Sequence, residues 1–288
     1  MPRLFSTTLA AALLASLPAM AQSLVDPAWL KTHLADPNVV VLDIRPEAHY
    51  AMGHVPGAVQ ADYETAGWRV RQPDGAAGAL PPVERIAATA GALGVGDNTH
   101  AIVFGDDFAA AARIYWTIKV LGHGDVSVLN GGETAWTAAG GPEETAIAAP
   151  HPAHFTPRYD ANIRAELPEV ASAVAEGGET LLDARPPAQW NGTAKTPVVK
   201  AFGHLPGAVW IDQTEALTAD GATLKPKAAL EALFAKVGDG PVIAYCNTGH
   251  LSATDWFVLS EVLHHPNTRM YDGSLSQWTA DASRPMAK

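Results

Sequence analysis

Short apolar runs alternate with segments of helical periodicity along most of the chain. The short runs predict buried strands, at 39–42, 101–104, 126–129, 181–183, 242–245 and 269–271. The segments between them predict helices, at 83–93, 109–121, 167–176, 227–237 and 253–263. Strands that alternate with helices predict an α/β fold, in which a mainly parallel sheet is flanked by helices.

The chain also contains an internal repeat. Three motifs occur twice in the same order, 140 to 150 residues apart: LDxRP at 42–46 and 182–186, GHxPGAV at 53–59 and 203–209, and a segment ending in Trp at 131–136 and 273–278. A repeat of this length predicts two tandem domains of one fold. We expect the first domain at 22–147, a proline-containing linker at 148–159 and the second domain at 160–288.

Residues 1–21 are typical of a secretory signal peptide. Arg3 supplies a positive start, residues 4–17 are mostly apolar, and Ala19-Met20-Ala21 is a cleavage motif. The apolar run is shorter than the roughly 20 residues that a membrane span requires. We therefore expect cleavage after Ala21, export to the periplasm, and a mature protein with no membrane span.

Composition excludes several classes of protein. The formal net charge of -11 disfavours nucleic acid as a partner. A single cysteine excludes an intrachain disulfide, cysteine-rich zinc modules and iron–sulfur clusters. The pair His264-His265 has no cysteine or carboxylate at a matching ligand spacing, so we expect neither a metal nor a cofactor.

That single cysteine, Cys246, follows the predicted strand 242–245 directly and is separated from a predicted helix by the short loop 247–251. Amides of such a loop and the start of the helix favour a thiolate and can hold an anion. Ser252 and Asp255 have the spacing of a capping box at the helix start. The alternative is an inert buried cysteine, but the polar neighbours and the strand-to-helix junction favour a reactive one.

Together, LDxRP, GHxPGA and the strand–Cys–loop–helix junction of the second copy resemble the rhodanese family, and most closely its tandem thiosulfate and 3-mercaptopyruvate sulfurtransferases. The resemblance covers nearly the whole expected mature chain. It implies two rhodanese-like domains, of which only the second is catalytic, with Cys246 as the nucleophile. Aligning Trp116 with Trp256 places Asp106 opposite Cys246, so the first copy lacks the nucleophile.

The resemblance implies a sulfurtransferase without a cofactor. Cys246 would take the outer sulfur of a small anionic donor, thiosulfate or 3-mercaptopyruvate, as a persulfide and pass it to cyanide or a thiol. Arg185 would contact the donor, although an ion pair with Asp183 would also explain it. The remaining substrate contacts would come from the cysteine loop: Asn247, Thr248, Gly249, His250, Leu251 and Ser252.

Two departures leave the donor open. Thiosulfate-specific relatives carry two basic residues early in the loop, where this chain has Asn247 and Thr248. Mercaptopyruvate enzymes tend to carry a further arginine several residues after Arg185, where this chain has Gln189, Trp190 and Asn191.

Two other functions compete with the enzyme. A non-enzymatic persulfide carrier that serves a specific partner would use the same cysteine. A phosphatase of the same fold would need an arginine at the position of Ser252, so the sequence disfavours this function.

Overall fold

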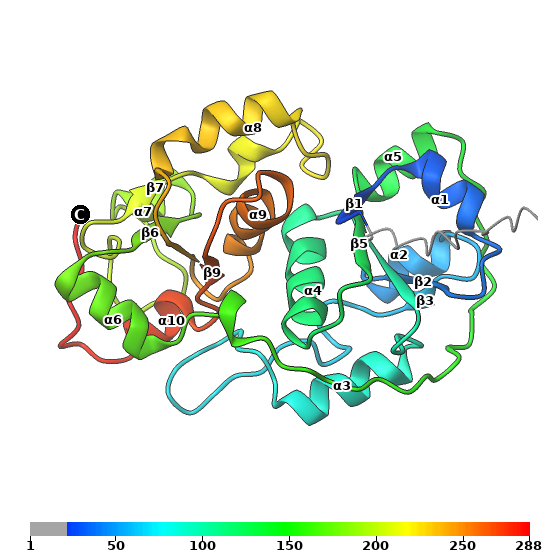
Figure 1. Cartoon of the computed structure of the whole chain (residues 1–288), viewed down its shortest axis with the longest axis horizontal. Helices are drawn as coiled ribbons and strands as arrows, with labels where there is room; N and C mark the ends of the chain where they lie inside the picture. Colours follow the sequence, from blue (N-terminus) through cyan, green and yellow to red (C-terminus); the bar gives the residue numbers. More distant parts are fainter. Residues whose placement is uncertain (1–21) are drawn as a thin grey trace, which may run out of the picture.

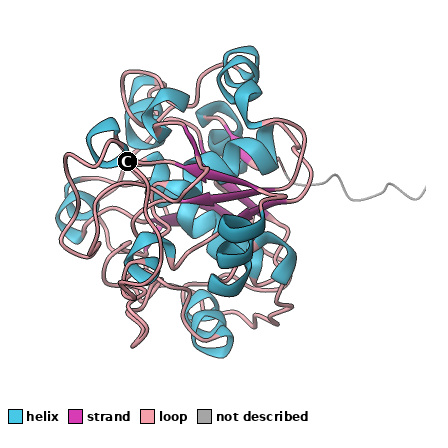
Figure 2. Ribbon diagram, turned by 90° about the vertical axis from the view of Figure 1, so that its left-hand side faces the viewer, coloured by secondary structure: helices cyan, strands magenta, loops and turns pink. Residues whose placement is uncertain are grey.

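The computed structural model describes residues 22–288 and contains two parallel sheets, each flanked by helices (Figures 1 and 2). The first sheet has the order β1-β5-β4-β2-β3 and the second the order β7-β6-β8-β9. The first sheet contains β1 (Leu24–Val25), β2 (Val39–Asp43), β3 (Val59–Gln60), β4 (His100–Phe104) and β5 (Val126–Leu129). The second contains β6 (Thr180–Asp183), β7 (Val209–Trp210), β8 (Val242–Tyr245) and β9 (Thr268–Met270).

Ten α-helices lie between and around these strands in the described part of the chain. Those of the first half are α1 (Pro27–His33), α2 (Glu47–Met52), α3 (Val83–Ala92), α4 (Phe108–Val120) and α5 (Gly132–Ala138). Those of the second half are α6 (Leu167–Glu176), α7 (Pro187–Trp190), α8 (Lys227–Phe234), α9 (Ser252–Phe257) and α10 (Ser274–Trp278). None of the helices within 22–288 is long and apolar enough to cross a membrane.

The two halves repeat one topology. β2, β3, β4 and β5 correspond in order and pairing to β6, β7, β8 and β9, and every strand pair is parallel. At the position of β1, the second sheet has only an isolated parallel bridge between Arg164 and Met270. The fold class predicted from the sequence, two α/β domains in tandem, is therefore confirmed.

Each predicted strand and helix corresponds to an observed element, with small shifts at the ends. The pattern missed β1, β3 and β7, which have two residues each and cannot show a period. The predicted helix at 253–263 is α9 followed by a π-helical segment, Val258–Val262. The expected signal peptide concerns residues 1–21, which lie outside the described residues.

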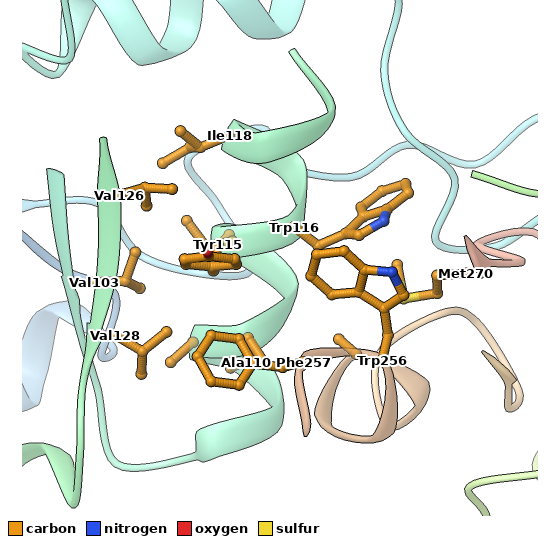
Figure 3. Close-up of a cluster of buried hydrophobic side chains, with 14 of the residues drawn as sticks. Val103, Ala110, Tyr115, Trp116, Ile118, Val126, Val128, Trp256, Phe257 and Met270 are labelled. Carbon is orange, nitrogen blue, oxygen red and sulfur yellow. The ribbon is translucent and has the colours of Figure 1, made fainter. Parts of the chain in front are cut away.

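Helices α4 and α9 pack against each other and join the two halves through one hydrophobic core (Figure 3). They are equivalent helices of the repeat, since each follows the central strand of its sheet. The ring of Phe257 meets Phe108 edge to face with centroids 5.4 Å apart, and it meets Tyr115 in the same way at 4.9 Å. Trp116 and Trp256, both fully buried, belong to the same core, as does Met270 (Figure 3). Residues of both halves are thus buried by the same contact.

This shared core predicts that the two domains unfold together. Phe257→Ala should lower the free energy of unfolding by about 3–5 kcal/mol, the usual cost of removing a buried aromatic ring. It should move a single calorimetric transition to lower temperature without splitting it. Phe202→Ala, at a side chain that is 44% exposed, is the control and should leave the transition in place. Two transitions, of which only one moves, would contradict a shared core.

Candidate active site

Cys246 lies at the carboxyl end of β8, which is buried along its length and lies between β6 and β9. In open α/β sheets, ligands bind beyond this end of the strands. The Cys246 side chain is fully buried. Its backbone N–H donates to Ser274 Oγ (3.1 Å), and its carbonyl accepts from the Leu275 N–H (3.1 Å). The start of α10 therefore helps to position the sulfur.

Ser274 is a residue of the site that sequence reasoning missed. Its φ of 48° lies in the left-handed region, where side chains are rare. Its hydroxyl accepts from the Cys246 N–H and donates to the Tyr271 carbonyl (2.7 Å), so a polar side chain is used at this strained position. The first repeat has Gly132 at the equivalent place with the same φ. In the aligned repeat Ser274 stands opposite Gly132, and this difference between the two copies is the sequence signal that could have identified Ser274.

The strand registers correct one detail of the repeat alignment. Asp43 pairs with Phe104 in the first sheet, and Asp183 pairs with Tyr245 in the second. The residue after Phe104 is Gly105, so Gly105, and not Asp106, occupies the place of Cys246 in the first domain. The discrepancy arises because the segments between strand and helix differ in length, which shifts the helix-based alignment by one residue. The first domain still lacks the nucleophile.

The loop 247–251 turns back so that Ser252 reaches the sulfur. Ser252 Oγ donates to Cys246 Sγ at 3.6 Å, and both side chains are fully buried. The predicted capping box is wrong: Ser252 is the first residue of α9, and the preceding Leu251 makes no side-chain cap. The hydroxyl is used at the sulfur instead of at the helix start, and it can stabilise a thiolate or persulfide there.

Asp255, the other member of the expected capping box, is a buried acid without a partner. The side chain is fully buried, and neither carboxylate oxygen has a hydrogen bond within the described chain. Burial, with the nearby negative charge of Asp183 as a second cause, raises the pKa of Asp255 well above its ordinary value. Asp255 is therefore a carboxyl group that favours the neutral form close to Cys246.

Arg185 is held in an ion pair, as its alternative interpretation predicted. Its Nε and Nη2 donate to both carboxylate oxygens of Asp183 (2.9 and 2.6 Å), and Nη2 also donates to the Gly203 carbonyl (2.8 Å). Arg45 makes the same contacts with Asp43 and Gly53 in the first domain. The pair therefore has a structural function in both copies.

One difference separates the two arginines. Arg45 Nη1 lies 3.0 Å from Glu133, whereas the repeat places Leu275 at the equivalent position of the second domain. Within the described chain, Nη1 of Arg185 has no hydrogen-bond acceptor. Its partner Asp183 pairs in the sheet with Tyr245, the residue before Cys246, so the ion pair lies on the strand next to the cysteine. A structural arginine thus keeps one donor for an anion, and its contact with substrate stays a prediction.

Asn247 and Gln189, two residues at which the sequence departs from the expected family pattern, contact each other. Asn247 Nδ2 donates to Gln189 Oε1 at 2.9 Å, while Asn247 Oδ1 is buried without a hydrogen-bond partner in the described chain. Two neutral amides therefore meet beside the cysteine. The second sequence position, Thr248, contributes its carbonyl oxygen to an interdomain contact.

His250 connects the cysteine loop to the first domain. Nε2 lies 3.1 Å from Asp107 Oδ2, and Nδ1 lies 2.8 Å from the Tyr63 hydroxyl. Burial alone would raise the pKa of Asp107, but the hydrogen bond and charge of His250 lower it overall. Tyr63 and Asp107 were not identified from the sequence, because their positions are more than 140 residues from His250 and only the domain packing brings them together.

The structure therefore gathers Cys246, Ser252, Asn247 and Arg185 in one neighbourhood and orients the rest of the loop toward the first domain. No group of three or more His, Cys, Asp or Glu side chains within 22–288 could hold a metal ion. The arrangement is suited to covalent chemistry at a buried sulfur that has a hydroxyl donor and a cation nearby.

Comparison with known proteins agrees with this arrangement. The rhodanese-like domain profile matches residues 26–139 and 166–281. A sulfur carrier protein of Thermus thermophilus is 32% identical over 92% of this chain and 96% of its own length. A thiosulfate sulfurtransferase of Corynebacterium glutamicum is 32% identical over 89% of this chain and 87% of its own. The crystal structure of SseA from Escherichia coli, described as a 3-mercaptopyruvate sulfotransferase, superposes with a TM-score of 0.78 at 28% identity, covering 88% of this chain and 99% of SseA.

The buried acid leads to a prediction about stability. Because the pKa of Asp255 is higher in the folded chain than in the unfolded chain, the folded protein keeps this proton while the unfolded chain loses it. Stability therefore falls as the pH rises from the ordinary aspartate range toward the folded pKa. Asp255→Asn removes this dependence, so its melting temperature relative to wild type should increase between pH 5 and pH 8. Asp239→Asn, at an exposed acid, is the control. A difference that does not change with pH would contradict a neutral Asp255.

Proposed function

The chain belongs to the rhodanese family and is a sulfurtransferase, and we propose that it transfers a sulfane sulfur through a persulfide on Cys246. The observation that carries this proposal is the position of the only cysteine at the carboxyl end of a central strand, with the Ser252 hydroxyl 3.6 Å from its sulfur. The relatives named as sulfurtransferases, which match both halves of the chain, support it.

In the first step the Cys246 thiolate attacks the outer sulfur of the donor. A sulfur–sulfur bond forms, and the bond between that sulfur and the rest of the donor breaks. When the donor is thiosulfate, the leaving group is sulfite, which takes the bonding electron pair. When the donor is 3-mercaptopyruvate, the leaving group is the enolate of pyruvate, which takes up the proton of the transferred thiol. The Ser252 hydroxyl and one donor of Arg185 stabilise the anions of this step.

In the second step a nucleophilic acceptor attacks the outer sulfur of the persulfide. Cyanide is converted to thiocyanate, or a thiol to its own persulfide, and the Cys246 thiolate is regenerated as the leaving group. Because Sγ is fully buried, the intermediate is kept from bulk water. The same burial favours small donors and acceptors.

The relative named as a sulfur carrier protein favours a second candidate function. In that case the Cys246 persulfide would pass its sulfur only to a specific partner. Turnover with cyanide as the acceptor distinguishes the two, because a dedicated carrier would load once and stop.

We also propose that the protein is exported to the periplasm after cleavage at Ala21. The sequence pattern of residues 1–21 supports this proposal.

The persulfide gives the first test of function. Incubation with thiosulfate or 3-mercaptopyruvate should add one sulfur, about 32 Da, to a protein with a single cysteine. Cys246→Ser should remove both the adduct and turnover, whereas Ser252→Ala should keep the adduct and form it more slowly. Mass spectrometry and thiocyanate release measure the two effects. A Cys246→Ser protein that still transfers sulfur would exclude the proposed nucleophile.

Donor preference gives the second test. Thiosulfate is a dianion, and the amide pair Asn247–Gln189 replaces cations that would bind it. We expect a higher kcat/KM for 3-mercaptopyruvate than for thiosulfate, and Asn247→Arg should raise kcat/KM for thiosulfate more than for 3-mercaptopyruvate. Asn98→Arg, at an exposed amide of the first domain, is the matched control. Kinetics are measured at both pH 6 and pH 8. Thiosulfate as the better wild-type donor at both values would refute the prediction.

A further inference from the structure

Arg113 is a fully buried cation of α4 that makes no salt bridge within 4.0 Å in the described chain. Burying a charge without an acid is costly unless hydrogen bonds replace its hydration. The guanidinium donates to three backbone carbonyls, those of Gly78 (2.8 Å), Gly249 (3.0 Å) and Thr248 (3.4 Å), and lies 5.0 Å from the centre of the Trp116 ring. Two of these carbonyls belong to the cysteine loop of the other domain.

These hydrogen bonds determine how the loop is oriented. In a trans peptide the carbonyl and the N–H point in opposite directions. The carbonyl of Thr248 shares its peptide with the N–H of Gly249, and that of Gly249 shares its peptide with the N–H of His250. Because Arg113 holds both carbonyls, the two N–H groups of these peptides face away from the guanidinium.

The backbones of both domains pack closely around the Arg113 guanidinium. Gly249 has a φ of +76°, and a Cβ there would lie 2.5 Å from Arg113 Nη1. A Cβ on Gly78 would lie 2.5 Å from the Thr248 carbonyl oxygen. Glycines on both sides thus allow the backbones of two domains to approach one guanidinium, which holds them together.

Arg113 also brings a positive charge to the cysteine loop. Burial lowers the pKa of Arg113, yet an arginine stays charged in proteins, and the two loop carbonyls that it holds lie two and three residues after Cys246. The acids in this part of the molecule are Asp183, paired with Arg185, Asp272, paired with Arg164, and Asp255, which has no partner in the described chain. The first domain therefore supplies a buried cation to the loop that follows the cysteine.

We propose that Arg113 is a positioning residue for sulfur transfer, supplied by the domain that lacks the cysteine: it orients the Thr248–Gly249 peptides and stabilises the anionic forms of Cys246. This inference rests on the proposed function for its link to catalysis. It assigns the non-catalytic domain a specific chemical task at the site, in addition to covering it.

The test uses Arg113→Met, which removes the charge and the hydrogen bonds, and Arg113→Lys, which keeps the charge but loses the planar fork that reaches several carbonyls. Ile118→Ala is the matched control, because Ile118 lies on the same helix and packs on Val126 of the first sheet (Figure 3). The first readout is the pH midpoint at which iodoacetamide alkylates the single cysteine. The second is kcat and KM for sulfur transfer.

We expect Arg113→Met to move the alkylation midpoint upward by about one pH unit and to lower kcat about tenfold or more with little change in KM. Arg113→Lys should keep the midpoint near that of wild type and still lower kcat. Ile118→Ala should lower the melting temperature and keep both the midpoint and kcat near wild type.

A wild-type midpoint in Arg113→Met, or an equal shift in Ile118→Ala, would overturn the inference. If Arg113→Met does not fold, a wild-type kcat in Arg113→Lys would overturn it. Alkylation needs no sulfur donor, so its result stands independently of the proposed function. Turnover by Cys246→Ser would instead refute the proposed function and leave the alkylation result intact.

Discussion

The packing of α4 against α9 determines where the groups around Cys246 lie. The two helices are equivalents of a repeat, and their contact buries aromatic side chains from both halves in one core. Since the cysteine loop leads directly into α9, the packing of α9 on α4 also places that loop in contact with the first domain. Arg113, Tyr63 and Asp107 meet the loop as a consequence.

A duplicated scaffold has become asymmetric through a few replacements at equivalent positions. Both copies keep a buried Asp–Arg pair at the carboxyl end of an equivalent strand, β2 or β6, with the same hydrogen bonds. The second copy has Cys246 where the first has Gly105, Ser274 where the first has Gly132, and Leu275 where the first has Glu133. These changes provide a cysteine, a hydroxyl that binds the backbone of that cysteine, and an arginine without a second acid. The chemistry therefore arises without a change of fold.

Charge is distributed unevenly between the surface and the site. The chain as a whole is acidic, yet the cations near Cys246 are buried arginines that bind backbone carbonyls or a paired acid. A buried guanidinium acts more strongly on a nearby anion than an exposed one, because solvent screens it less. The positive charge of the site thus comes from buried arginines in an acidic protein, while the neighbouring amides of Asn247 and Gln189 are neutral.

Local and periodic features of this protein could be determined from the sequence alone: the strand–helix alternation, the two copies, and Cys246 at a strand-to-helix junction. Such features depend on residues a few positions apart or on the comparison of one copy with the other. The spacing of Ser252 and Asp255 wrongly predicted a helix cap. The Ser252 hydroxyl donates to the Cys246 sulfur instead, and only the folded loop brings these two groups together. The contacts of Arg113 with the cysteine loop and of His250 with Tyr63 join residues more than 130 positions apart. Only the tertiary structure decided them, since the packing of two helices, and no local preference, sets the distance between the domains.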